Sequence, residues 1–203
     1  MLDHVFLDAV DVIRRAFADG LLERHPHEDR LAADILLGDL VWETSCSLPG
    51  DGVPPRVRAD VTLDWSSWSQ SAWRAELLGE PPEERPELGI EVVFRVQRLA
   101  ERPDLDAVMA VVPHESPEIG EDRLERSGPV VEESYQEADR AIAVEVGFEG
   151  AYRLPETGPS TEAMAGHLRV MSAWIASTLV RLGDLRLVYL PPDPDPDPDP
   201  DPV

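Results

Sequence analysis

The chain contains no lysine. All 18 of its basic residues are arginine, and 41 acidic residues give the 203-residue chain a formal charge of −23. Without lysine there is no phosphate-binding P-loop, whose lysine contacts the phosphates, and no lysine nucleophile or Schiff base. The acidic balance argues against nucleic-acid binding, which depends on cations that neutralise phosphates, and against docking on an anionic membrane surface.

Cysteine and long apolar runs are also scarce. Cys46 is the single cysteine, so no disulfide can form within the chain, which favours a reducing compartment. The first residues, MLDHVFLDAV, lack the basic start and apolar core of a secretory signal. No run approaches the roughly 20 apolar residues that cross a bilayer. We therefore expect a cytoplasmic protein that does not insert into membranes.

Hydrophobic periodicity predicts an α+β fold. Apolar side chains recur at helical spacing over residues 3–19 and again over residues 161–181. Between these helices, apolar and polar residues alternate in four segments, which predicts a four-stranded antiparallel sheet with a long C-terminal helix packed on it. The four segments are residues 40–48, 57–65, 90–96 and 141–152. The acidic, proline-punctuated stretch 101–137 is expected to be mostly loop, with a short strand at 107–112.

Composition divides the chain into three parts. Residues 1–34 are predicted to be an N-terminal helical extension, residues 35–190 an α+β domain, and residues 191–203 a disordered tail. The tail alternates Asp and Pro; proline lacks a backbone donor and neighbouring aspartates repel each other, so the tail is expected to stay extended. It carries five of the aspartates, so the rest of the chain keeps a charge of −18.

Two stretches resemble the bacterial export chaperone SecB and its toxin–antitoxin-associated relatives. The segment AIAVEVGFEGAYRLPE (141–156) is similar to the family's last sheet strand, and HLRVMSAWIASTLVRLGDLRLVYLPP (167–192) to its main helix and the extended segment after it. Upstream, DLVWETSCSLP (39–49), VRADVTLDW (57–65) and GIEVVFRVQRLA (89–100) stand where that family places its earlier strands. The resemblance covers roughly residues 35–190.

The resemblance implies a non-enzymatic holdase that binds unfolded or nascent polypeptides, for export or as antitoxin-type clients. Such proteins form a dimer of dimers through their sheets and main helices and pass their clients to a motor ATPase. The resemblance therefore implies a homo-oligomer, a dimer or a tetramer, and as a further partner a basic segment of a translocase motor or an antitoxin. The acidic balance agrees on physical grounds, because a negative body attracts cationic chains at long range. No cofactor and no metal are expected.

Aromatic residues supply the candidate binding surface. The candidate client-binding residues are Trp65, Trp68, Trp73, Phe94 and Trp174. Rigid aromatic side chains suit promiscuous binding. The other interpretation places Trp65 in the core and the remaining tryptophans over a sheet edge or an interface. The candidate oligomer-interface residues are Phe148, Leu168, Met171 and Ile175.

Other chemistries are poorly supported. His25 and His27 flank a proline without a second ligand cluster, which disfavours a metal site. Asp64 and Glu91 invite comparison with a metal-dependent nuclease, but Val93 stands where such a site places a lysine. No constellation suggests an enzyme. The alternative to a chaperone is a structural or adaptor protein of a phage-tail or secretion-type assembly.

Overall fold

The computed structural model describes residues 4–20, 22–25, 28–34, 37–51, 54–136, 139–154 and 161–191. It contains four helices, α1 (His4–Asp19), α2 (Ser67–Leu77), α3 (Leu105–Val111) and α4 (Thr161–Gly183). Its strands are β1 (Glu23–Arg24), β2 (Arg30–Ala33), β3 (Leu40–Ser47), β4 (Val57–Trp65), β5 (Glu87–Leu99), β6 (Glu125–Arg126), β7 (Val130–Gln136) and β8 (Asp139–Arg153). The class is α+β, as predicted.

All strands belong to one antiparallel sheet whose order is β1-β3-β4-β5-β8-β6, with β2 also on β3 and β7 also on β8. The four predicted strands are its centre, β3, β4, β5 and β8. The prediction of four strands is an undercount, because the sheet has eight. At each edge, two shorter strands pair with different parts of the same long strand, so β1 and β2 form one edge and β6 and β7 form the other.

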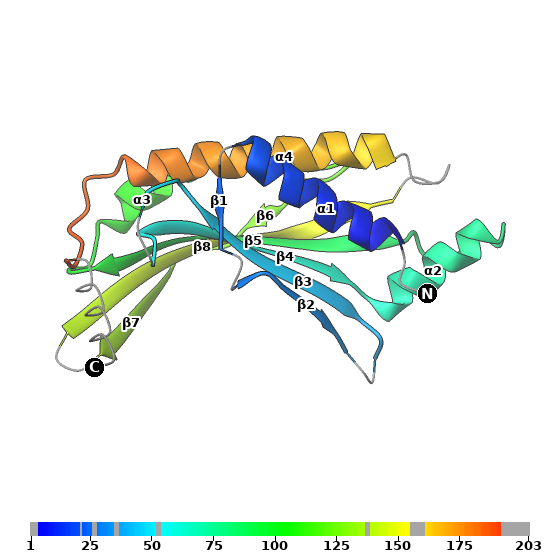
Figure 1. Cartoon of the computed structure of the whole chain (residues 1–203), viewed down its shortest axis with the longest axis horizontal. Coiled ribbons are helices and arrows are strands. Elements are labelled where there is room, and N and C mark those ends of the chain that lie inside the picture. The colour runs from blue at the N-terminus through cyan, green and yellow to red at the C-terminus, as the bar shows by residue number, and fades with distance from the viewer. Residues whose placement is uncertain are drawn as a thin grey trace, which may run out of the picture.

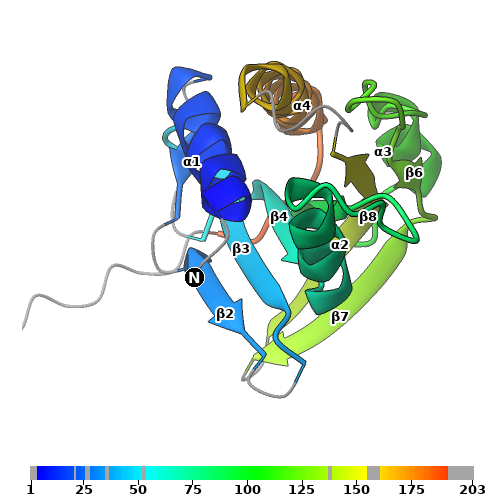
Figure 2. The same ribbon diagram turned by 90° about the vertical axis from the view of Figure 1, so that its right-hand side faces the viewer.

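The alternation along the central strands decides which face of the sheet is covered. In β4 the residues at odd positions from Val57 to Trp65 are buried, and those between them are only half-buried. Because successive side chains point to opposite faces, one face is apolar and the other is charged. Helices α1 and α4 lie side by side over the apolar face, and none of the four helices in the described residues covers the other side, here called the open face (Figures 1 and 2).

One hydrophobic core joins both helices to the sheet. The rings of Phe94 and Phe148 stack edge-on against Trp174 of α4, with centroids 5.2 and 4.9 Å away. Phe6 of α1 packs in the same way on Trp65, at 5.9 Å. Residues 4–20, which the sequence marked as part of an extension, therefore contribute to the core that the sheet and α4 share. The Asp-Pro tail beyond residue 191 lies outside the described residues.

Three elements differ from the sequence prediction. The segment predicted as a short strand at 107–112 lies in helix α3, which Asp104 caps by accepting a hydrogen bond from the amide of Asp106. Strand β7 lies in the stretch predicted to be mostly loop and pairs with the first half of β8. Helix α2 occupies the serine- and tryptophan-rich segment after β4, where Ser66 is its N-cap.

Candidate functional site

The three tryptophans of the predicted cluster differ in their exposure to solvent. Trp65 is the last residue of β4 and is 1 % exposed, whereas Trp73 packs into the core at 3 %. Trp68 is 42 % exposed on the first turn of α2. Phe94 is buried and Trp174 is half-buried against it. The five predicted client-binding residues therefore do not form one exposed surface, and Trp68 alone among them presents a largely accessible ring.

The predicted oligomer-interface residues lie inside one chain. Leu168, Met171 and Ile175 of α4 are fully buried, as is Phe148 of β8 on which this helix packs. Their apolar stripe holds α4 on its own sheet. Val170 and Val180, on the outer side of the same helix, are about half exposed.

The open face carries a row of carboxylates. Glu91 of β5 stands directly opposite Glu149 of β8, and Glu149 stands opposite Glu125 of β6. None of the three forms an ion pair with a described residue. Burial and then the charges of Glu149, Glu145 and Glu43 raise the pKa of Glu91 above its usual range. Like charges directly opposite each other destabilise a sheet, so this row lowers the stability of the fold locally.

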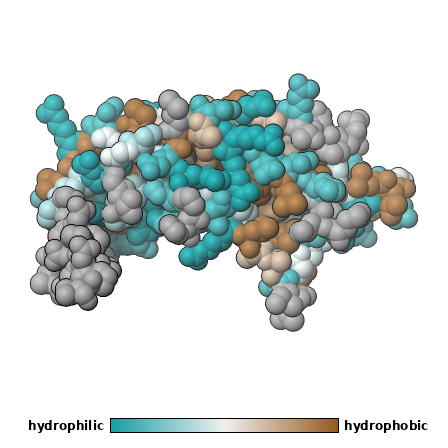
Figure 3. All heavy atoms as spheres, viewed as in Figure 1, coloured by the Kyte–Doolittle hydropathy of each residue, from teal (hydrophilic) through white to brown (hydrophobic). Residues whose placement is uncertain are grey.

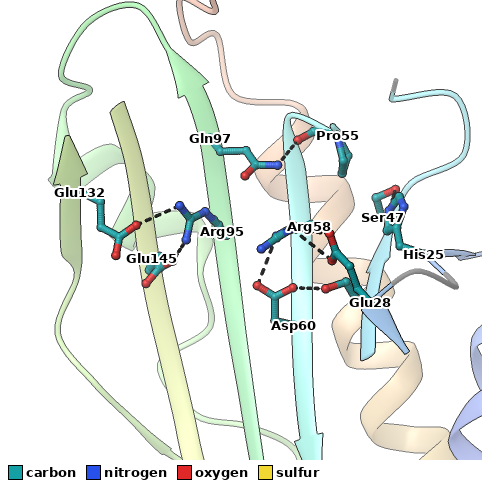
Figure 4. A network of polar contacts seen from close by, with 11 residues as sticks. His25, Glu28, Ser47, Pro55, Arg58, Asp60, Arg95, Gln97, Glu132 and Glu145 are labelled. Carbon is teal, nitrogen blue, oxygen red and sulfur yellow. Dashed lines mark hydrogen bonds and ion pairs between the residues drawn. The ribbon is translucent and has the colours of Figure 1, made fainter. Parts of the chain in front are cut away.

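Beside that row, two arginines each form ion pairs with two carboxylates (Figure 4). Arg58 contacts Glu28 and Asp60, each at 3.2 Å. Arg95, directly opposite Arg58, contacts Glu145 and lies 2.9 Å from Glu132 of β7. Burial opposes the ionisation of Glu28, but a hydrogen bond with Ser45 and the charge of Arg58 outweigh it and lower its pKa. These contacts fasten both edges of the sheet to its centre.

Exposed apolar side chains lie on edge strand β2, in the turn that follows it and on helix α2. All four residues of edge strand β2 are exposed, with Leu31 at 52 %. Leu37, in the turn to β3, is 67 % exposed. Apolar atoms are visible over β2 and at the far end of α2, where Leu77 and Leu78 are exposed (Figure 3).

Hydrogen bonds hold helix α2 against this turn. The side-chain amide of Gln70 donates to the carbonyl of Gly38 at 2.8 Å, and the amide of Ser67 donates to Asp39 at 2.6 Å. Trp68, the next residue along, therefore lies at the same end of the sheet as Leu37. We call Leu31, Leu37 and Trp68 the β2-end surface. Sequence analysis identified Trp68 but not the two leucines, because nothing in their local pattern distinguishes an edge strand from a buried one.

The ligand-type residues singled out in the sequence do not converge among the described residues. Within the described ranges, no three His, Cys, Asp or Glu side chains converge as metal ligands. His25 contacts Ser47 at 3.0 Å, and His27 lies outside the described residues. Cys46 is fully buried, and burial raises the pKa of its thiol far above the usual value, so it does not act as a nucleophile. Asp64 and Glu91 lie on adjacent strands of the open face but not directly opposite each other.

No protein-family model, no curated protein and no solved structure matches this chain. Among the helices in the described ranges, none combines the length and apolar character that a membrane crossing requires.

Proposed function

We propose that this protein is a non-enzymatic, SecB-like holdase that binds unfolded polypeptide. The observation that carries the proposal is the β2-end surface: an exposed edge strand beside exposed apolar side chains from a turn and from helix α2. An edge strand offers unpaired backbone groups, which an extended chain can pair with in any sequence. Apolar side chains next to that edge favour unfolded clients, because folded proteins bury such residues.

The same geometry sets the strength of binding. Strand β2 is four residues long, from Arg30 to Ala33, so an added strand gains few ladder hydrogen bonds. Burying one exposed leucine or tryptophan contributes about 1.5–3 kcal/mol before ordering costs are subtracted. A short ladder with two or three apolar contacts therefore supports reversible binding.

The acidic open face supports the second part of the proposal, a basic partner. The unpaired row of Glu91, Glu125 and Glu149 adds to a chain whose total charge is −23. A cationic segment, whether in a client or in a motor protein of the kind that the SecB resemblance implies, would neutralise the row. Salt would weaken such an association, because it screens exposed charges.

One observation favours the alternative, an adaptor in a larger assembly. Strand β7 forms the opposite edge of the sheet, and Val130 and Tyr135 on it are 53 % and 72 % exposed. Two free edges on one sheet suit partner-dependent association of several chains. An adaptor of this kind would not suppress the aggregation of unfolded proteins, which gives a direct distinction from a holdase.

The test is an aggregation assay with single-residue variants. Trp68→Ser and Leu31→Ser should each weaken suppression of client aggregation roughly tenfold, equivalent to about 1.4 kcal/mol of lost apolar contact. Val180→Ser is the matched control, because Val180 is 46 % exposed but lies on the outer side of α4. Equal activity of all three variants and the unmodified chain would remove the β2-end surface from the client site.

Trp73 is not a usable probe of client binding. Its side chain is 3 % exposed and belongs to the hydrophobic core, so Trp73→Ser would damage the fold itself. Large-to-small changes of buried aromatics cost about 3–5 kcal/mol. Lost activity in that variant would report unfolding rather than a lost contact.

A further inference from the structure

The chain places its own C-terminal segment, residues 185–191, beside the end of β5. After α4 ends at Gly183, the segment runs back to the sheet, where Leu99 and Tyr189 form an antiparallel bridge (Figure 1). The amide of Ala100 donates to the carbonyl of Val188 at 2.9 Å, and the amide of Leu190 donates to the carbonyl of Arg98 at 2.7 Å. The segment therefore pairs with β5 as a short added strand.

The position it occupies is one that β4 leaves empty. Strand β4 begins at Val57, which pairs with Val96, so β4 does not extend along the last residues of β5. On the other side of β5, Leu99 pairs with Ile142 of β8. The C-terminal segment consequently covers a stretch of the β5 backbone that none of the eight described strands pairs with on that side.

The segment is held by two ladder bonds and by half-buried side chains. Besides the ladder bonds, the guanidinium of Arg98 donates to the carbonyl of Pro191, and that of Arg56 lies 5.2 Å from the ring centre of Tyr189. Leu185, Leu187 and Tyr189 pack against the core but are only half-buried, and Val188 is 54 % exposed. Segments with few buried contacts and few backbone bonds open locally far more often than a core strand does.

The receiving strand is distorted at the point of contact. Arg98 has φ 61°, and among the described residues it is the one non-glycine in the left-handed region. The pairing of β5 with β8 also shifts register between Val96 and Leu99. Strained backbone and bulges collect at sites that bind other groups, because they redirect donors and acceptors. Here the strained residue supplies the carbonyl that accepts from Leu190.

Beside the segment the surface is hollowed. The hollow has a volume of about 360 Å³, and its lining combines apolar side chains, among them Leu99, Leu185 and Leu187, with the charged residues Glu101, Arg102, Asp104 and Arg186. The segment's own side chains therefore do not fill the space available.

We infer that the end of β5 is a strand-acceptor site, which residues 185–191 occupy within the chain and from which an extended client segment displaces them. The client that fits has apolar residues at alternate positions and free backbone amides, the pattern of Leu185, Leu187 and Tyr189. This inference rests on the proposed polypeptide-binding function and gives it a second site, one that is closed until a competing strand arrives.

The test uses the full-length chain and a fluorescently labelled peptide, LRLVYLP, copied from residues 185–191. In the variant Leu190→Pro the segment loses the amide that donates to the carbonyl of Arg98, so the segment should leave the site more readily. The variant should therefore bind the peptide at least tenfold more tightly than the unmodified chain. Val188→Ala is the matched control; it keeps the carbonyl that accepts from Ala100, so its affinity should equal that of the unmodified chain. A peptide N-methylated at the residue equivalent to Leu190 should not bind.

Several results would overturn the inference. One is the absence of peptide binding by Leu190→Pro when circular dichroism shows that the variant is folded. Another is equal binding of the N-methylated peptide. A third is a larger oligomer for Leu190→Pro than for the unmodified chain by light scattering, which would mean exchange between copies. The aggregation assay with Trp68→Ser fails or succeeds independently of these results. Peptide binding without suppression of aggregation would keep the acceptor site and reject the holdase, and the reverse outcome would reject only the acceptor site.

Discussion

Replacing Asp29 with asparagine removes one charge from a carboxylate that joins three elements. The indole of Trp42 on β3 donates to its Oδ1 atom at 2.6 Å, and Nη2 of Arg14 on α1 donates to the same atom at 2.9 Å. Nη1 of Arg24 on β1 lies 3.2 Å from Oδ2. The side chain of Asp29 is only 11 % exposed, so these contacts lie close to the protein interior.

The size of the effect follows from this partial burial. Breaking a fully buried ion pair costs about 3–5 kcal/mol, and breaking an exposed pair costs about 0–1 kcal/mol. Arg14 and Arg24 are 38 % and 33 % exposed, and an asparagine oxygen still accepts from Trp42. We therefore expect Asp29→Asn to lower the free energy of unfolding by about 2 kcal/mol near neutral pH.

The effect should also depend on pH. Burial opposes the ionisation of Asp29, but hydrogen bonds from Arg14 and Trp42 and the charges of Arg14 and Arg24 outweigh it and lower its pKa. A lowered pKa means that the stabilisation is complete above the unfolded value of about 3.9 and is lost as the pH falls through the folded value. The difference between the unmodified chain and Asp29→Asn should therefore shrink as the pH falls below about 4.

Urea unfolding followed by far-ultraviolet circular dichroism, at neutral and at acid pH, measures this difference. Asp11→Asn is the matched control, because Asp11 is 55 % exposed and contacts the same arginine at 3.6 Å. That variant should lose less than about 0.5 kcal/mol. The reasoning fails if the two variants are equally stable, or if the effect of Asp29→Asn does not change with pH.

Two further predictions concern the sheet. Glu91→Gln should raise the free energy of unfolding by about 0.5 kcal/mol at neutral pH, because it removes repulsion from Glu149. Because the pKa of Glu91 is raised in the folded chain, ionised Glu91 destabilises the fold, and this destabilisation disappears as the pH falls below about 4.3. If Glu91→Gln remains more stable than the unmodified chain in acid, charge repulsion is not the cause. Cys46 should react with a thiol reagent only at the rate of unfolding, because its thiol is fully buried; fast labelling of the native chain would show that the strand opens locally.

The sequence predicted the centre of the fold because burial there follows a simple period. In β4 each residue from Val57 to Trp65 takes the face that its polarity indicates. The same holds for α4, where Leu168, Met171 and Ile175 form the buried stripe. Where one face is packed and the other is solvated, polarity records the geometry directly.

In the elements that the sequence prediction missed, polarity does not follow burial in this way. Helix α2 buries Ser69, Gln70 and Ala72 beside Trp73, so its packed side is partly polar and shows no apolar stripe. Strand β7 is an edge strand with both faces largely exposed, and Glu133 and Tyr135 stand where a packed strand would carry apolar residues. Helix α3 contains two valines and a methionine in seven residues, a composition equally compatible with a strand.

The candidate site shows the same limit. Polarity identified Trp68 as an aromatic residue that could lie at the surface, but the exposure of Leu31 and Leu37 depends on which strand forms the sheet edge. The carboxylate row likewise depends on register, because Glu91 and Glu149 are 58 positions apart in the chain and meet only through the pairing of β5 with β8. Such long-range pairings are not encoded in any local window.

The central claim is that this protein binds unfolded polypeptide, and the most direct test is light scattering on a sizing column with reduced, carboxymethylated α-lactalbumin, which cannot refold. We predict a complex whose mass exceeds that of either component, and the same complex should be weakened by Trp68→Ser but not by Val180→Ser. Two separate peaks at every ratio of the components, with the chain at the mass that it has alone, would contradict the claim and favour the adaptor.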